Sequence, residues 1–206
     1  MHYFKGIAIA EIQAAIAKKK QNFSTEWLGK SLAYTPYQPR PLSLRRTDSL
    51  HTLFTIPTHH TEFLQLAITH QDCAAFITES LEISTYIRRY VNVPLVYDFL
   101  ILDSYQLLES LVYGIDGVML YPKFLSHTEL QELSNYALKL GLERIFCIES
   151  KEDLTKAIFA KADILNLCDN DALIPLIPKQ KILLSKVLET DTKLLEALDA
   201  RILALS

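Results

Sequence analysis

The chain has 206 residues, of which 50% are hydrophobic and 22% are charged, and its formal net charge at neutral pH is −3. This composition is typical of a globular protein and excludes a disordered or fibrous one. The small negative charge gives no general attraction to nucleic acid or to an anionic membrane, so we expect neither as a partner.

The cysteines and the amino terminus indicate the compartment. Cys73, Cys147 and Cys168 are odd in number, far apart and set in apolar runs, which is typical of buried thiols in a reducing compartment. The apolar stretch over residues 7–16 is interrupted by Glu11 and Gln13, so we expect no signal peptide and no membrane span. The sequence therefore predicts a cytoplasmic protein.

Residues 1–48 predict a helical arm followed by an extended strap. Isoleucines recur at helical spacing between residues 9 and 16, and lysines at 18–20 suit the carboxyl end of that helix. Residues 24–33 predict a second, short helix. Three prolines between residues 36 and 41 then break regular structure up to about residue 47.

From residue 50 onward, short apolar runs alternate with segments of helical periodicity. The runs recur at roughly 20-residue intervals, which is too long for hairpins, so consecutive strands should be parallel and joined by right-handed crossovers. Eight such strands are enough to close a barrel. The predicted strands are Leu50–Ile56, Cys73–Ile77, Val93–Tyr97, Gly117–Tyr121, Arg144–Ile148, Asp163–Leu167, Lys181–Leu184 and Arg201–Leu205.

We therefore predict an α/β fold, an abridged TIM (β/α)8-like barrel with a parallel sheet and an N-terminal helical extension. The domains would be residues 1–48, the arm and strap, and residues 49–206, the barrel. An open doubly wound sheet is the alternative. The sequence stops at the eighth strand without the last helix, and the arm or another chain is a candidate to cover that place.

Two predicted helices have marked ends. Asp103 with Gln106, and Ser126 with Glu129, have the spacing of a capping box. A glycine follows each of these helices, at positions 114 and 141, where a left-handed cap is expected.

Residues 93–109, VPLVYDFLILDSYQLLE, are the most specific segment. They resemble indole-3-glycerol-phosphate synthase, a barrel enzyme of tryptophan biosynthesis, whose third strand runs through Pro-Val/Ile-Leu-x-Lys-Asp-Phe-Ile/Leu into Asp-x-Tyr-Gln-x-x-Glu. Residues 114–120, 125–130, 137–142 and 175–178 agree further. The resemblance is good over 93–152, weaker to 206 and weak before 90, although that family also has a helical amino-terminal extension.

The resemblance implies a carbon–carbon carboxy-lyase that closes an indole ring from a carboxyphenylamino deoxyribulose phosphate, with loss of carbon dioxide and water. That reaction needs a general acid for the ketone, a partner carboxylate and a strong anion site. It implies no cofactor. We expect no metal either, because the adjacent His59 and His60 have no second ligand pair.

The resemblance supplies the candidate catalytic residues. The family's lysine precedes its Asp-Phe pair, which places Tyr97 at that position and Asp98 beside it. The family also has a glutamate at its fifth strand, which would fall near Cys147, and Glu149 lies two residues beyond that position. Lys123 is the cation after the fourth strand. Tyrosine can donate a proton but is neutral, so it cannot supply the field of an ammonium group.

The candidate ligand-binding residues are Asn170, aligned with the family's Asn-x-Arg, and Ser185 with Lys186, aligned with its Glu-Ser-Gly. The family's Glu-x-Lys falls near Thr55–Pro57, where both charges are absent. Barrels of this kind hold phosphate with glycine-containing loops after strands seven and eight. No glycine follows Gly141.

Three functions are compatible with these residues. We favour a catalytically degenerate homologue that binds a small-molecule ligand or a protein partner in a binding, scaffolding or regulatory role. The second is a divergent enzyme acting on a non-phosphorylated ligand, which requires Tyr97, Asp98, Lys123, Glu149 and Lys186 to converge on one pocket. The third is a genuine synthase with substituted catalytic groups.

Overall fold

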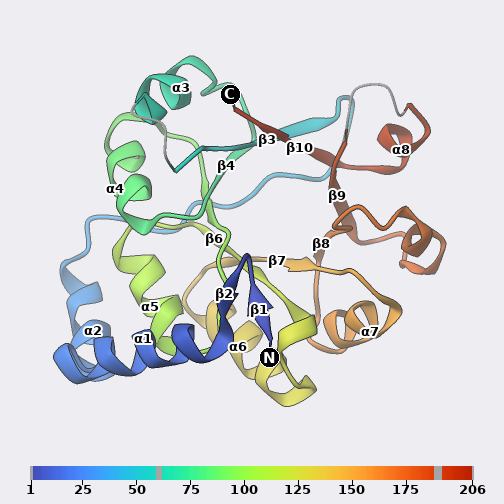
Figure 1. Cartoon of the computed structure of the whole chain (residues 1–206). Helices are drawn as coiled ribbons and strands as arrows, with labels where there is room; N and C mark the ends of the chain where they lie inside the picture. Colours follow the sequence, from blue (N-terminus) through green and yellow to red (C-terminus); the bar gives the residue numbers. More distant parts are fainter. Residues whose placement is uncertain (1, 59–61, 188–191, 206) are drawn as a thin grey trace.

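The structure, a computed structural model, describes residues 2–58, 62–187 and 192–205. Eight parallel strands form a closed barrel in the order β10-β3-β4-β5-β6-β7-β8-β9 (Figure 1). The predicted barrel is confirmed, and the open sheet is excluded. His59 and His60 lie outside the described residues. The strands are β3 (His51–Thr55), β4 (Ala75–Thr78), β5 (Leu95–Tyr97), β6 (Gly117–Leu120), β7 (Glu143–Cys147), β8 (Ile164–Asn166), β9 (Ile182–Lys186) and β10 (Ala200–Ala204).

Helices cover the outside of the barrel between the strands. In chain order they are α3 (Phe63–Thr69), α4 (Leu81–Tyr90), α5 (Ser104–Val112), α6 (His127–Lys139), α7 (Lys151–Phe159) and α8 (Thr192–Ala197). A short 3-10 helix, η2 (Pro122–Phe124), precedes α6, and another, η3 (Asp171–Leu176), takes the place of a full helix after β8. No described residue after β10 is helical, and no described helix is long and apolar enough to cross a membrane.

The strands are apolar on both faces because both faces are covered. Alternate side chains point into the barrel, where Leu53, Ile77 and Val96 belong to one cluster. Their neighbours Phe76 and Leu95 belong to the outer cluster, packed under the helices. This is why the strand segments read as continuous apolar runs.

The predicted helix ends are confirmed. Asp103 with Gln106 caps α5, and Ser126 with Glu129 caps α6, each as a complete capping box. The glycines that follow these helices, at positions 114 and 141, have φ values of 82° and 77°, a region that residues with a Cβ rarely adopt.

The amino-terminal arm consists of α1 (Ile9–Asn22), α2 (Thr25–Ser31) and a 3-10 turn, η1 (Leu32–Tyr34). It lies along α5, far from β10 (Figure 1). The buried faces of α1 and α2 explain this placement, because Ile16 and Leu28 pack with Tyr105 and Leu108 of α5. The arm therefore does not cover the place beside the eighth strand.

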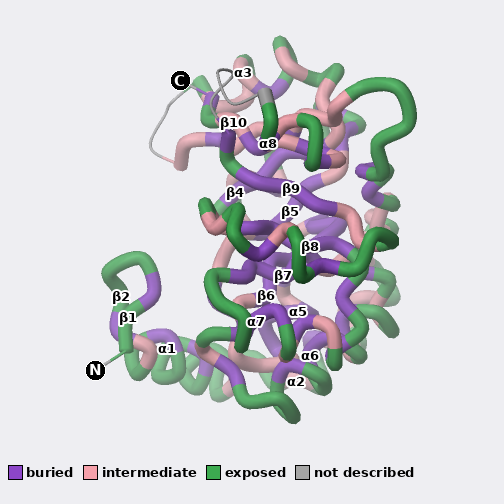
Figure 2. The backbone as a smooth tube through the Cα atoms, turned by 90° about the vertical axis from the view of Figure 1, so that its right-hand side faces the viewer, coloured by how far each residue is buried: buried purple, intermediate pink, exposed green. Residues whose placement is uncertain are grey.

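A hairpin that sequence analysis did not predict precedes α1. Strands β1 (Tyr3–Phe4) and β2 (Ile7–Ala8) are antiparallel. The two residues between them, Lys5 and Gly6, have φ values of 49° and 84°, as in the primed turns that suit two-residue hairpins. Figure 2 shows the hairpin projecting from the body of the molecule, with its turn exposed.

The strap after the arm packs into the barrel. Leu42 and Leu44 are buried and belong to the interior cluster. Arg40 of the strap and Arg88 of α4 both form ion pairs with Asp116, whose side chain is fully buried at the start of β6. The strap thus closes the amino-terminal end of the barrel, opposite the end where the strands finish. The boundary between residues 48 and 49 stays a prediction.

Candidate functional site: the mouth of the barrel

A cavity of about 210 Å³ lies where the strands end, at the face where barrels of this kind keep their chemistry. Polar side chains from several strand ends and from the hairpin share it. The polar lining residues are Lys5, Thr55, Glu79, Asp98, Tyr121, Asn166, Cys168, Asp169 and Lys186.

Lys5 brings an ammonium group into this mouth from the tip of the hairpin. Its Nζ lies 2.6 Å from a carboxylate oxygen of Asp98 and 2.6 Å from one of Glu79. Burial alone would lower the pKa of Lys5, but the two carboxylates outweigh it, and the pKa is raised above its ordinary value. Lys5 is therefore protonated at neutral pH.

Aromatic packing anchors the hairpin beside the mouth. The ring of Phe4 is buried and makes edge-to-face contacts with Phe99, Tyr121 and Phe124, at centroid distances of 5.9, 4.8 and 5.9 Å. Such contacts contribute beyond simple burial of area. Because these contacts fix Phe4, they also hold the adjacent Lys5 beside the mouth.

Asp98 connects the Lys5 ammonium group and the Tyr121 hydroxyl in the mouth. One carboxylate oxygen accepts from Lys5, and the other accepts a short hydrogen bond from the Tyr121 hydroxyl. Burial, with help from Cys147 and Asp98, raises the pKa of Tyr121, so its hydroxyl stays a donor. Lys5, Asp98 and Tyr121 form a connected chain of hydrogen bonds.

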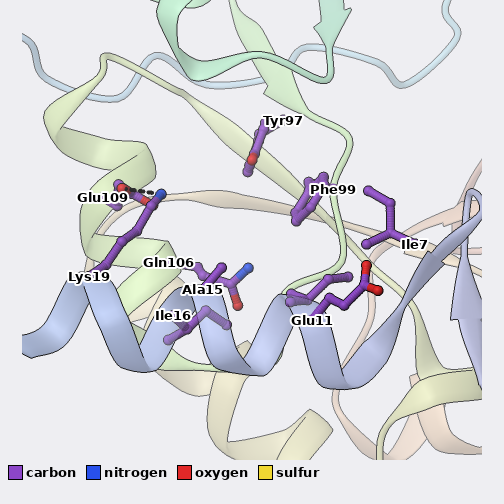
Figure 3. A pocket seen from close by; sticks show the side chains of 10 residues that line it. Ile7, Glu11, Ala15, Ile16, Lys19, Tyr97, Phe99, Gln106 and Glu109 are labelled. Atoms are coloured by element: carbon purple, nitrogen blue, oxygen red, sulfur yellow. Dashed lines mark hydrogen bonds and ion pairs between the residues drawn. The ribbon is translucent and has the colours of Figure 1, made fainter.

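Asp98, rather than Tyr97, faces the mouth. Val96 points into the barrel, and by strand alternation Asp98 does too, whereas Tyr97 packs in the outer layer. Figure 3 shows Tyr97 and Phe99 facing α1 outside the barrel. In the family pattern the lysine lies four residues after the proline. The residue four positions after Pro94 in this chain is Asp98. Alignment on the Asp-Phe pair instead gives Tyr97.

The other candidate residues do not converge on the mouth. Lys123 and Glu149 pair with each other, 2.7 Å apart, and both side chains are about half exposed. Asn170 donates to the backbone carbonyl of Glu149. Ser185 is buried on the outer face of β9, between two inward-facing residues. Of the predicted set, only Asp98 and Lys186 line the cavity, which contradicts the five-residue arrangement required for the divergent enzyme.

Seven of the nine polar lining residues were not among the predicted site residues: Lys5, Thr55, Glu79, Tyr121, Asn166, Cys168 and Asp169. Glu79 lies two residues after the predicted strand Cys73–Ile77, and Tyr121 is the last residue of the predicted strand Gly117–Tyr121, so their position at strand ends could have indicated them. Asn166 ends β8 and is nearly buried, and it faces the mouth where Asn170 was expected to. Lys5 had no local signal except its place before Gly6, because its partners Glu79 and Asp98 are distant in sequence.

The three cysteines and the potential metal ligands form no disulfide and no metal site among the described residues. Cys147 is buried as predicted, whereas Cys73 and Cys168 are only partly buried, and none forms a disulfide. Within residues 2–58, 62–187 and 192–205, no group of three or more His, Cys, Asp or Glu side chains is arranged to hold a metal ion.

Comparison with known proteins identifies the family. The family model for indole-3-glycerol phosphate synthase matches residues 74–173. The indole-3-glycerol phosphate synthase of Campylobacter curvus is 34% identical over 208 residues, covering 83% of this chain and 79% of the relative. The chain belongs to the indole-3-glycerol phosphate synthase family. The enzyme of that name from Sulfurimonas denitrificans is 32% identical over 213 residues, covering 86% of this chain and 81% of its own.

A solved structure supports the fold independently. A variant of the tryptophan synthase alpha-subunit from Pyrococcus furiosus superposes with a TM-score of 0.59 at 15% identity, covering 78% of this chain and 88% of that one. At this identity the likeness concerns the barrel alone. The indole-3-glycerol phosphate synthase family assignment therefore rests on the sequence matches, which extend beyond residues 93–152.

Proposed function

We propose that the chain catalyses the ring closure for which its relatives are named, at the mouth of the barrel. The observation that carries the proposal is the Lys5 ammonium group, held 2.6 Å from both Asp98 and Glu79. It restores to the mouth the positive charge that the strand end lacks, because Asp98 stands where the family has its lysine. The family's general acid would thus come from the amino-terminal hairpin instead of a barrel strand.

In this proposal each residue of the mouth has a separate role in the reaction. Lys5 protonates the ketone oxygen of the carboxyphenylamino deoxyribulose phosphate while the new ring bond forms, and carbon dioxide and water leave afterwards. Asp98 and Glu79 hold the ammonium group, and Tyr121 orients Asp98. Lys186, at the end of β9, would face the phosphate. Tyr97, Lys123 and Glu149 take no part in this scheme.

The test is an indole-forming assay with the full chain and this substrate. We expect turnover by the wild type and a loss of about 100-fold or more in kcat for Lys5→Met, because a general acid typically contributes that much. Lys18→Met, an exposed lysine of α1, is the matched control and should keep full activity. A wild type without turnover overturns the proposal.

A second candidate is the degenerate homologue that binds a ligand without converting it. Two features favour it: three carboxylates, Glu79, Asp98 and Asp169, face only two ammonium groups, Lys5 and Lys186, and no glycine follows Gly141 to build an anion loop. An acid-rich mouth disfavours a phosphate. Calorimetric binding of a reduced substrate analogue, in the absence of turnover, would support this candidate.

A further inference from the structure

Two cysteines from neighbouring strands meet inside the barrel at its mouth. Cys147 ends β7 and pairs across the parallel strands with Asn166, which ends β8. Cys168 follows Asn166 by two residues, so strand alternation places its side chain on the same face. Cys147 belongs to the interior cluster, and Cys168 packs against that cluster. Both thiols therefore face the inside of the barrel.

The contacts of the two cysteines show that their thiols touch. The side chain of Asn166 bridges them, because its Nδ2 donates to the Sγ of Cys147 at 3.7 Å and its Oδ1 accepts from the backbone amide of Cys168 at 3.3 Å. Burial, together with a hydrogen bond to the Cys168 thiol, raises the pKa of Cys147. No other side chain separates the two sulfur atoms at this contact.

A turn with an unusual backbone carries Cys168. The amide of Asn170 donates to the carbonyl of Leu167 at 2.9 Å, and the two residues between them, Cys168 and Asp169, have φ values of 46° and 65°. Turns with two positive φ values favour asparagine and glycine, and other residues hold this conformation only where the surroundings impose it. The side chain of Asn170 donates to the carbonyl of Glu149 at 2.8 Å, which fixes the turn beside the end of β7.

The two thiols differ in their access to solvent. Cys168 is partly buried and lines the cavity at the mouth, whereas Cys147 is 2% exposed and lies behind it. The third cysteine, Cys73, is at the amino-terminal side of β4, where its thiol donates to the carbonyl of Ala75 at 3.5 Å. A small oxidant that enters the mouth therefore meets Cys168 first, with Cys147 as the neighbouring thiol.

We propose that Cys168 is an oxidation site of this protein and that Cys147 is its resolving thiol. A hydroperoxide that enters the mouth oxidises Cys168, and Cys147 converts the product into a reversible disulfide between the ends of β7 and β8. The bond ties the turn that carries Asp169 to β7, so the oxidation state of the two cysteines changes the lining of the mouth. This inference is independent of the proposed ring closure, because it concerns only the two thiols.

The chemistry takes place in two steps with hydrogen peroxide. The thiolate of Cys168 attacks one oxygen, so that an S–O bond forms, the O–O bond breaks and hydroxide leaves with the proton of the thiol as water. The sulfur of Cys147 then attacks the sulfenic acid; an S–S bond forms, the S–O bond breaks, and a second water carries away the proton of Cys147. The two thiols lose the two electrons that the peroxide gains. A thiol reductant reverses the bond by exchange.

The test is to map the bond in the folded full chain. The protein is treated with stoichiometric hydrogen peroxide, its free thiols are capped with iodoacetamide in urea, and it is digested with trypsin without reduction. Lys151 and Lys161 lie between the two cysteines, so trypsin separates them. We expect mass spectrometry to find their two peptides joined, lighter than their sum by two hydrogen atoms, with Cys73 capped. Dithiothreitol should release both peptides.

Matched variants assign the roles of the three cysteines. Cys73→Ser should leave the joined peptides unchanged, and Cys168→Ser should abolish them and leave Cys147 reduced and capped. Cys147→Ala should leave Cys168 as a sulfenic acid that dimedone labels. Circular dichroism establishes that each variant is folded.

Three results overturn the proposal. The first is a wild type whose three cysteines all stay reduced, and the second is a bond that includes Cys73. The third is oxidation of Cys168 in the wild type while Cys147 stays free. A bond that forms only after unfolding in urea contradicts the proposal as well, because the folded barrel then does not bring the two sulfur atoms together.

Discussion

At the scale of single residues, Asp116 is a charge held by several partners at once. Its fully buried carboxylate accepts from the guanidinium groups of Arg40 and Arg88 and from the backbone amide of Leu95. Such a cluster joins the strap, α4, β5 and β6 at one point. Because every member is satisfied, it stabilises one arrangement of these elements; a missing member would leave charge buried without compensation.

We expect Asp116→Asn to lower the free energy of unfolding by about 3 kcal/mol, because it leaves Arg88, whose side chain is 6% exposed, without a counter-charge. Urea unfolding followed by circular dichroism measures the change. Glu26→Gln removes one partner of an exposed helical pair with Lys30 and should cost less than about 0.5 kcal/mol. Equal effects of the two substitutions would contradict the argument.

Residue register limited what the sequence could reveal about the site. The motif around Pro94 predicted the third strand correctly, but two neighbouring residues, Tyr97 and Asp98, fitted the lysine position depending on which end of the motif was aligned. Because strand side chains alternate, a shift of one residue moves a side chain from the mouth to the outer face. Only the observed packing of Val96 and Asp98 decides between them.

At the scale of elements, local signals predicted what local interactions determine. The eight strands follow from buried apolar runs, and the caps of α5 and α6 follow from side chains three residues apart. The hairpin of β1 and β2 has only two residues in each strand, too few for a periodic pattern. Its position depends on tertiary contacts of Phe4 and Lys5, which no local pattern carries.

The docking of this hairpin should depend on pH. The pKa of Lys5 is raised in the folded chain, so its ion pairs stabilise the fold below about pH 10.5, the ordinary lysine value, and are lost as pH rises through the higher folded value. Because Lys5 is one third exposed, we expect wild type to exceed Lys5→Met by about 1 kcal/mol or less at neutral pH.

That difference is measured as the free energy of unfolding of both chains at several pH values. It should be constant from pH 7 to 9 and shrink above pH 10.5. Lys18→Met provides the reference for an exposed lysine of α1 that lies outside the mouth. A difference between wild type and Lys5→Met that persists unchanged at the alkaline end would show that the ion pairs contribute nothing.

At the scale of the whole molecule, the segment that precedes the barrel contacts both of its ends. The hairpin reaches the mouth through Lys5, and the strap fills the opposite end through Leu42 and Leu44. Residues 1–48 are therefore part of the packing of the barrel and of its site. The strap thus fills the amino-terminal opening, while the hairpin leaves a cavity of about 210 Å³ at the mouth.

Leu44 is the clearest test of this closure. Its side chain is fully buried among interior residues of the strands, so Leu44→Ala should leave a cavity and lower the free energy of unfolding by about 3 kcal/mol. Leu138→Ala removes the same atoms from a side chain that is 58% exposed on α6 and should cost less than about 1 kcal/mol. Chemical unfolding of both variants gives the comparison. If Leu44→Ala costs no more than Leu138→Ala, the strap does not plug the barrel, and the arm and strap would be an appendage that the barrel can fold without.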